Sequence, residues 1–238
     1  MIELIIQAQP NDETCGATSL HSIYQYYGFN IPLEDVIKTV EKSLSGGTLA
    51  YMLGKHALQH GFSASIYVYN VHLYDPTWFT NGAVDNQFLI DKLYQQMQYK
   101  NDPYITKATM ALLDFLNLGG KIVSESLNPT LLKKYFAAKT PILASLCATH
   151  LYRCSREWFT PEGESVFDDI RGTPCGHFVV LCGYDEETHE VVVADPLAKN
   201  PLSNSNYYKV STNRLINSIM LGVLTYDGNL LIIKPNLK

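Results

Sequence analysis

Two short segments that lie far apart along the chain constrain its fold more than any other feature. Gln9 stands six residues before a Cys15–Gly16 pair, and His177 and an Asp195–Pro196 pair lie near the other end of the sequence. A thiol becomes an effective nucleophile when an imidazole is within reach and donors wait for the oxyanion. If these residues act together, the fold must bring the first 16 residues against the C-terminal part of the chain.

Cys15 opens an apolar-periodic run that predicts a helix. The apolar positions that carry this period are Ala17, Leu20, Ile23 and Tyr27. A helix N-terminus carries roughly half a unit of positive charge and free N–H groups, so a thiolate in its first turn is stabilised. We therefore expect Cys15 to be the nucleophile. Gln9, on the preceding loop, can supply a side-chain N–H to the oxyanion alongside the backbone donors.

Two β-branched runs, 177–184 and 190–195, predict a β-hairpin around the polar stretch 185–189. If the turn is centred on Glu186, His177 and Asp195 face each other across the ladder, with Cβ atoms about 5 Å apart. The carboxylate would then hold one ring nitrogen at roughly 2.7 to 3.2 Å and leave the other to take the thiol proton. A register shifted by one residue would place the two side chains on opposite faces.

Taken together, these residues resemble a known family. Gln-x5-Cys-Gly, a His that opens a strand and an Asp-Pro that closes the next are similar to the papain-like cysteine peptidases of the bacteriocin-processing type, peptidase family thirty-nine. The similarity is best over 9–62 and 175–196. It implies an α+β papain-like fold in which N-terminal helices carry Cys15 and a C-terminal antiparallel sheet carries His177 and Asp195. It also implies a Cys-His-Asp triad, an oxyanion-hole role for Gln9 and cleavage of leader peptides after paired small residues.

The function that the resemblance implies is hydrolysis of a peptide or amide bond through an acyl-enzyme on Cys15, with a peptide or protein as substrate. Acyltransferase, deamidase and transglutaminase reactions use the same triad and are alternatives, because the groove selects the acceptor. A non-catalytic peptide-binding module is a second class. The competent residue at every catalytic position argues against it.

Chain length predicts a single domain over 1–238, with an insertion of about 70–120. Members of the family are commonly the N-terminal part of an export transporter, whereas this sequence has no apolar run long enough for a transmembrane span. We expect a polar loop over 151–174. The acidic part of that loop, 157–169, precedes His177 and could gate the substrate.

Charge and cysteine content restrict partners and compartment. A formal net charge of −5 and scattered Lys and Arg residues argue against nucleic acid. The N-terminal apolar run is too short for a signal peptide, and five cysteines without CxxC spacing suit a reducing compartment. We expect a cytoplasmic protein without cofactor or metal, although export without a signal peptide leaves little trace in sequence. Nothing in the sequence indicates an oligomeric state.

Three other sets of residues have two interpretations each. Cys175, two residues before His177, is either a rival nucleophile or a buried small residue, and a zinc site is disfavoured by the irregular spacing of Cys147, His150, Cys154, Cys175 and His177. His56 and His60 share a helix face and lack the Glu of a metalloprotease motif, so we expect them at the surface. An aromatic set is expected to be core, with groove lining as the alternative; it comprises Tyr67, Tyr69, Tyr74, Trp78 and Phe79.

Overall fold

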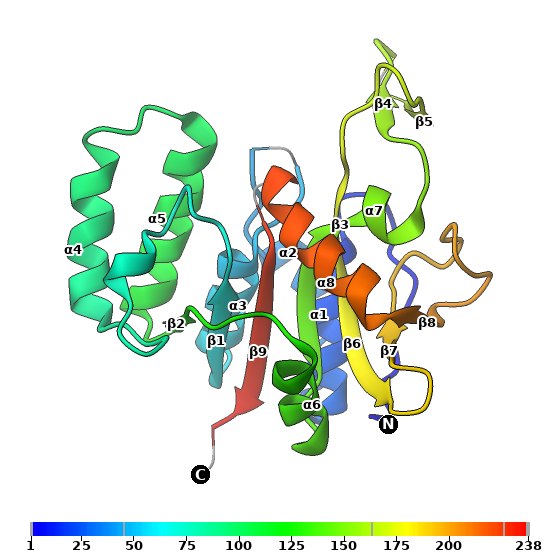
Figure 1. Cartoon of the computed structure of the whole chain (residues 1–238), viewed down its shortest axis with the longest axis horizontal. Helices are drawn as coiled ribbons and strands as arrows, with labels where there is room; N and C mark the ends of the chain where they lie inside the picture. Colours follow the sequence, from blue (N-terminus) through cyan, green and yellow to red (C-terminus); the bar gives the residue numbers. More distant parts are fainter. Residues whose placement is uncertain (1, 45, 163, 226, 237–238) are drawn as a thin grey trace.

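A seven-stranded sheet runs through the middle of the molecule, in the order β2-β1-β9-β3-β6-β7-β8 (Figure 1). The structure is a computed structural model that describes residues 2–44, 46–162, 164–225 and 227–236. Neighbouring strands are antiparallel except β1 and β2, which are parallel. The strands are β1 (Phe62–Val68), β2 (Lys121–Val123), β3 (Ile142–Cys147), β6 (Gly176–Asp185), β7 (Glu190–Ala194), β8 (Tyr207–Ser211) and β9 (Asn229–Pro235).

Helices cover both faces of this sheet. On one face lie α1 (Cys15–Tyr26), α2 (Leu33–Thr39) and α3 (Ala50–Gln59), and α5 (Pro103–Asn117) packs on α3 with α4 (Asn86–Met97) outside it. The other face carries α6 (Pro129–Ala137), α7 (Ala148–Tyr152) and α8 (Thr212–Leu221) (Figure 1). Two short 3-10 turns complete the set, η1 (Pro76–Trp78) and η2 (Gly222–Thr225). The expected α+β class, with Cys15 on an N-terminal helix and His177 on an antiparallel sheet, is confirmed.

Because side chains alternate along a strand, the sheet separates two hydrophobic cores. Phe178 and Val180 of β6 enter the core under α1 and α3, whereas Val179 and Leu181 enter the core under α6 and α8. Continuous apolar strands such as β3 are therefore buried on both sides. This double burial holds β3 and β6 rigidly beside each other, and β6 carries His177.

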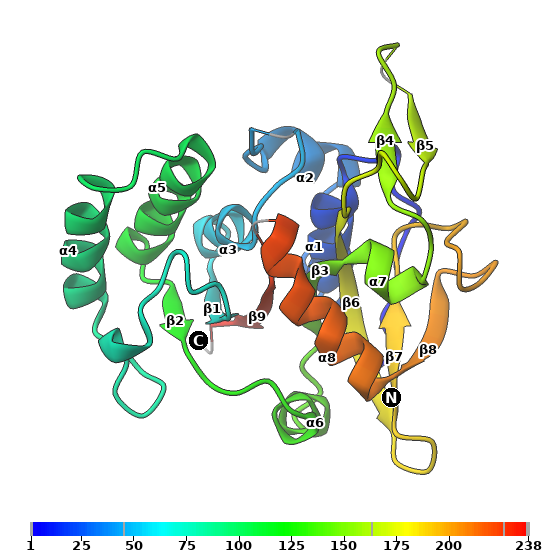
Figure 2. The same ribbon diagram turned by 45° about the horizontal axis from the view of Figure 1, so that its top comes forward.

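Residues 70–120 lie at one side of the molecule, where α4 and α5 stand next to α3 (Figure 2). Their contact with the rest is close, because a Cβ on Gly54 would lie 2.6 Å from the Phe115 ring. Phe115 and Leu112 of α5 are fully buried in the same core as α1.

The N-terminal segment is fastened to the end of the sheet that carries β6, β7 and β8. Ile2 donates its N–H to the carbonyl of Cys182 at 2.8 Å. The Tyr207 hydroxyl donates to the carbonyl of Leu4 and accepts from the N–H of Ile6, both at 3.0 Å. These bonds carry the chain along the sheet to Gln9 and so place the following loop near Asp195.

The expected polar loop over 151–174 is wrong. Its first residues complete α7, and β4 (Glu157–Phe159) pairs with β5 (Ser165–Phe167) in a two-stranded hairpin that projects from the molecule (Figure 1). Each strand is only three residues long and polar residues surround it, so the sequence shows no extended alternation that would predict a strand.

The expected surface position of His56 is also wrong. His56 is buried, with Nδ1 2.7 Å from the Tyr24 hydroxyl and Nε2 2.9 Å from the Thr39 hydroxyl. Burial, and then the neighbouring His60, lower the pKa of His56 to about 4. The side chain is therefore a neutral, hydrogen-bonded part of the core, which the helical spacing of two histidines did not reveal.

Candidate active site

Cys15 is the first residue of α1, and a tight turn delivers it there. The Asn11 carbonyl accepts from the Thr14 hydroxyl at 2.9 Å and from the Thr14 N–H at 3.3 Å, while the Asn11 side chain accepts from the Glu13 N–H at 3.1 Å. These bonds are local alternatives to helix and stop α1 from extending backwards. The first N–H groups of a helix have no acceptor within it, so the start of α1 offers donors in the turn that holds the buried Cys15.

Gly16 allows the start of α1 to press against β6. A Cβ at this position would lie 2.5 Å from Cγ2 of Thr48 and 3.2 Å from the Phe178 ring. One turn further along, the Ser19 hydroxyl donates to the carbonyl of Phe178 at 3.2 Å. The glycine after the cysteine is thus a packing requirement that brings Cys15 beside the residue that follows His177.

His177 and Asp195 meet, but not as the direct cross-strand partners that we expected. Near the turn Asp185 faces Glu190, whereas further along the ladder Val180 faces Ala194, because the register shifts between Leu181 and Gly183. If the register that pairs Val180 with Ala194 is continued by one residue, Asp195 lies opposite Val179. His177 is two residues away on the same face, so the contact is diagonal.

The extra residue in this strand, Cys182, forms a β-bulge that decides which face His177 uses. Had the register at the turn continued unbroken, Asp195 would lie opposite Val180, whose side chain points away from that of His177. The single inserted residue restores the shared face. The expected regular ladder centred on Glu186 gives the wrong turn position and the wrong cross-strand partners. It is right only in placing the His177 and Asp195 side chains on the same face of the sheet.

The contact between the two side chains is a short hydrogen bond. Nε2 of His177 lies 2.8 Å from Oδ1 of Asp195, within the range that we expected. His177 is 7% exposed and Asp195 is 0% exposed, so water does not screen the pair. Cys15 lies close enough to the ring to contribute to the raised pKa of His177, so thiol, imidazole and carboxylate form one group.

Two tyrosines that sequence analysis missed complete the surroundings of Asp195. The hydroxyls of Tyr152, from α7, and Tyr208, from β8, each donate to Oδ2 at 2.7 Å. The N–H of Leu197 donates to Oδ1 at 2.8 Å. Both carboxylate oxygens are therefore saturated by donors, as a buried charge requires. No local motif in the sequence links these two tyrosines to Asp195.

These contacts set the electrostatics of the pair. Burial disfavours the charged His177 ring, but the Asp195 carboxylate, followed by Cys15, outweighs burial and raises the pKa of His177 above its usual range. Burial likewise works against ionised Asp195, but His177, Tyr208 and Tyr152 outweigh it and hold the pKa of that carboxyl below its usual value. The two shifts favour an imidazolium next to a carboxylate.

Gln9 lies beside Asp195 in the loop that leads to Cys15. Its backbone N–H donates to the Pro196 carbonyl at 2.9 Å, and its side-chain Nε2 donates to the Asn11 carbonyl at 3.0 Å. Its Oε1 is buried and has no hydrogen-bond partner among the described residues. The backbone bond to Pro196 fixes Gln9 next to Asp195, and the side chain closes the turn that precedes Cys15.

The remaining cysteines differ from Cys15 in their surroundings. All five are free thiols. Burial, and then the Glu157 carboxylate, raise the pKa of Cys175 well above its usual range, and burial raises the pKa of Cys182 to about 11. Burial also raises the pKa of Cys154. These shifts favour the unreactive thiol form, so Cys175 is a poor rival nucleophile. No three His, Cys, Asp or Glu side chains in the described ranges are grouped to hold a metal ion.

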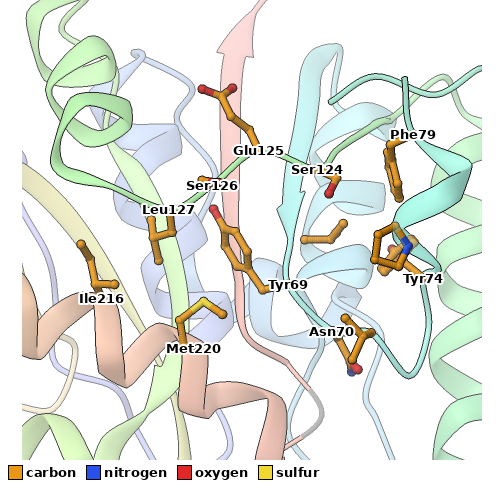
Figure 3. Close-up of a pocket in the computed structure, with 13 residues that line it drawn as sticks. Tyr69, Asn70, Tyr74, Phe79, Ser124, Glu125, Ser126, Leu127, Ile216 and Met220 are labelled. Carbon is orange, nitrogen blue, oxygen red and sulfur yellow. The ribbon is translucent and has the colours of Figure 1, made fainter. Parts of the chain in front are cut away.

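A pocket of about 520 Å³ lies between the segment 124–127 and α8 (Figure 3). Tyr69, Tyr74 and Phe79 line it, so three of the five aromatic residues that we singled out border a cavity. Tyr67 is instead buried, with its hydroxyl 2.7 Å from that of Tyr135. None of the four candidate catalytic residues lines this pocket.

The model of the Peptidase_C39 like family matches residues 1–218. The chain is similar to a double glycine motif protease from an AMS/PCAT transporter, solved in complex with the leader peptide, at 18% identity over 99% of this chain and 94% of that one, with a TM-score of 0.45. It is also similar to a putative C39-like peptidase from Bacillus anthracis, at 16% identity, coverage of 100% and 98%, and a TM-score of 0.44. The peptidase domain of Streptococcus ComA, a bi-functional ABC transporter involved in quorum sensing, gives 12% identity, coverage of 99% and 100%, and a TM-score of 0.46. No curated protein matches the chain significantly.

None of the helices in the described part of the chain combines the length and the apolar character that crossing a bilayer requires.

Proposed function

The chain belongs to the Peptidase_C39 like family, and we propose that its cysteine peptidase activity is carried by Cys15 as nucleophile, His177 as base and Asp195 as the residue that orients the base. One observation supports this assignment above the others. His177 Nε2 bonds the buried Asp195 carboxylate at 2.8 Å, and Cys15 lies close enough to the ring to contribute to its raised pKa. A thiol beside an imidazole that a carboxylate orients is what nucleophilic catalysis requires.

In the proposed reaction His177 takes the thiol proton on Nδ1, because Asp195 already occupies Nε2. The sulfur attacks the carbonyl carbon of the substrate, and the carbon–nitrogen bond breaks as the ring gives its proton to the leaving amine. Water then gives a proton to the same nitrogen and attacks the thioester. The carbon–sulfur bond breaks, the acid product leaves, and the sulfur regains a proton from the ring. The raised pKa of His177 favours the protonated ring that these steps pass through.

Gln9 is our candidate for the side-chain donor to the oxyanion, together with the first N–H groups of α1. In the free protein its Nε2 is bonded to Asn11, so the amide must release that carbonyl when the substrate carbonyl arrives. The unpaired Oε1 lowers the cost of this turn, because no hydrogen bond within the described chain holds that end of the amide.

We propose a peptide or protein substrate, with the leader-type specificity of the family as the finer expectation. A mixture of cellular peptides incubated in water labelled with heavy oxygen tests the reaction class by mass spectrometry. Hydrolysis puts the label into new C-termini, deamidation converts Gln or Asn side chains, and acyl transfer joins an added amine to the acyl group. We expect labelled C-termini with wild type and with Cys175→Ser, and none with Cys15→Ser. Labelled cleavage that survives in Cys15→Ser would refute the assignment, and adducts alone would favour the transferase alternative.

We further propose that the chain is one domain in which about 70–120 is an insertion, and that the protein is cytoplasmic. The core that Phe115 shares with α1 and α3 supports the first proposal. The five free thiols support the second, because they suit a reducing compartment.

A further inference from the structure

The β4–β5 hairpin exposes a large apolar face. Phe159 is 65% exposed and Phe167 is 62% exposed, and nearby Ile170 is 80% exposed. In the register of the hairpin Phe159 pairs with Ser165 and Glu157 with Phe167, so the two phenylalanines lie diagonally on one face. A soluble monomer rarely leaves several large apolar side chains together in water, and aromatic clusters of this kind mark protein interaction sites.

The opposite face of the hairpin is already occupied. Trp158 pairs with Val166, and the Arg171 guanidinium stacks on the Trp158 ring at 3.8 Å. Arg171 also bonds Asp168 at 2.6 Å. The stacked Arg171 side chain and its ion pair with Asp168 stabilise the hairpin on the face opposite the two phenylalanines. The exposed apolar face therefore belongs to an ordered hairpin.

The hairpin and its base carry an excess of negative charge. The segment 153–171 holds five carboxylates, at Glu157, Glu162, Glu164, Asp168 and Asp169, and three arginines, at Arg153, Arg156 and Arg171. In the described part of the chain, the only ion pair of this segment joins Asp168 to Arg171. Glu162, Glu164 and Asp169 are exposed. A partner that covers the apolar face must therefore bring positive charge, and an anionic membrane would be repelled.

The base of the hairpin is fixed to the candidate active site. The preceding helix α7 ends with Tyr152, which bonds Asp195, and the chain returns to His177 at the start of β6. Backbone bonds of 3.1 and 2.8 Å join Glu157 to Thr173, and the Cys175 carbonyl accepts from Ala148 at 2.8 Å. In both views the hairpin projects from the molecule beyond α7 (Figures 1 and 2).

We propose that this face is a docking surface for an extended, basic and apolar segment of the polypeptide substrate, outside the part that is cleaved. The inference rests on the proposed function for the identity of the partner as substrate. Phe159 and Phe167 supply the apolar contact, and Glu162 and Glu164 supply charge complementarity. The occupant is held on the side of the active site, because the hairpin lies between Tyr152, which bonds Asp195, and His177 along the chain.

Binding can be measured without turnover by fluorescence anisotropy, with Cys15→Ala as the background in every arm. The probe is a fluorescein-labelled Lys-Leu repeat peptide, and a Glu-Leu repeat is its charge control. We expect Phe159→Ser with Phe167→Ser to weaken probe binding about tenfold or more, since two apolar contacts are lost. Tyr99→Ser, which removes an aromatic side chain that is 82% exposed on the far side of the molecule, is the matched control and should bind as the background does.

A second variant keeps the apolar face and reverses its charge. Glu162→Lys with Glu164→Lys should weaken binding of the basic probe and reduce the salt dependence of that binding. Both side chains are exposed, so these substitutions leave the packing of the hairpin unchanged. Failure of the background protein to bind the Lys-Leu repeat, equal binding of the Glu-Leu repeat, or unchanged binding by the double Phe variant would overturn the proposal. So would a dimer in sedimentation that the double Phe variant abolishes, because the face would then bind a second copy.

Probe binding at the hairpin and the reactivity of Cys15 can be measured independently, so the docking proposal and the catalytic proposal can fail separately. Alkylation of Cys15 by iodoacetamide in an otherwise wild-type protein should proceed at the same rate with and without the hairpin substitutions. A protein that binds the probe at the hairpin but cleaves nothing would retain the docking surface and lose the peptidase assignment.

Discussion

Replacing the two tyrosines that hold Asp195 should destabilise the protein in a pH-dependent way. Each hydroxyl donates to the same carboxylate oxygen at 2.7 Å, and Asp195 is 0% exposed, so no water can take the place of a lost donor. A hydrogen bond to a charged group contributes about 1.5 to 3 kcal/mol. Tyr152→Phe and Tyr208→Phe should therefore each lower the free energy of unfolding by about 2 kcal/mol at pH 7. The double variant should lose less than the sum, because one oxygen is shared.

The pH dependence follows from the direction of the shift. The pKa of Asp195 is below its usual value in the folded protein, so the stability that comes from the ionised carboxylate is present above the unfolded value of 3.8 and is lost as pH falls through the folded pKa. The difference between wild type and either variant should shrink in the same window. Tyr67→Phe is the matched control, because its hydroxyl bonds the neutral Tyr135 hydroxyl at 2.7 Å.

Urea unfolding of the three single variants across the acid range measures both effects. Tyr67→Phe should cost about 1 kcal/mol at every pH at which the protein folds. The two active-site variants should also lose turnover with little change in KM, since Asp195 would hold the imidazole less firmly. If Tyr152→Phe costs no more than Tyr67→Phe, or if its cost is constant with pH, the hydroxyl does not stabilise a buried charge and the reasoning is wrong.

Three further predictions concern single residues. Gln9→Ala should lower turnover by about 10² with little change in substrate affinity, and normal turnover would assign the oxyanion to backbone donors alone. Asp195→Asn should keep the fold but lose part of the activity, because an amide orients the ring without stabilising the imidazolium by charge; full activity would contradict an electrostatic role. Burial raises the pKa of Asp227 to about 7, so the free energy of unfolding falls by about 4 kcal/mol as pH rises from 3.8 to 7. The pKa of His56 is lowered to about 4, so this residue adds about 3 kcal/mol to the free energy of unfolding as pH rises from 4 to 6.5. Burial also lowers the pKa of His21, which adds a rise in the same window. Wild-type stability in urea should therefore rise only slightly from pH 4.5 to 6.5, and Asp227→Asn should make it rise more steeply; an unchanged curve would show that Asp227 is not the opposing group.

The sequence predicted the elements that carry the site better than it predicted their pairing. The helix at Cys15 and the two strands around 185–189 were readable because their apolar periods differ and because polar residues separate them. The bulge at Cys182 was not readable, since a single extra residue leaves the apolar run unbroken. It is nevertheless this residue that brings His177 and Asp195 to one face.

Long-range contacts escaped the sequence for a different reason. Tyr152 and Tyr208 reach Asp195 from a five-residue helix and an edge strand, and nothing local marks either residue as a donor to a carboxylate. The β4–β5 hairpin was mistaken for a loop because its strands are three residues long and surrounded by charge. The tyrosine contacts are tertiary, so periodicity carries no information about them, whereas the hairpin is local and too short to show a period.

The most direct test of the account is the identity of the first cysteine to react. Intact wild-type protein treated with a limiting amount of iodoacetamide at neutral pH can be followed by mass and mapped by peptide, with all five thiols free to compete. The account predicts a first adduct on Cys15, formed much more slowly in His177→Ala, and no early adduct on Cys175 or Cys182. A first adduct on another cysteine, or a Cys15 rate that does not change when His177 is removed, would contradict it.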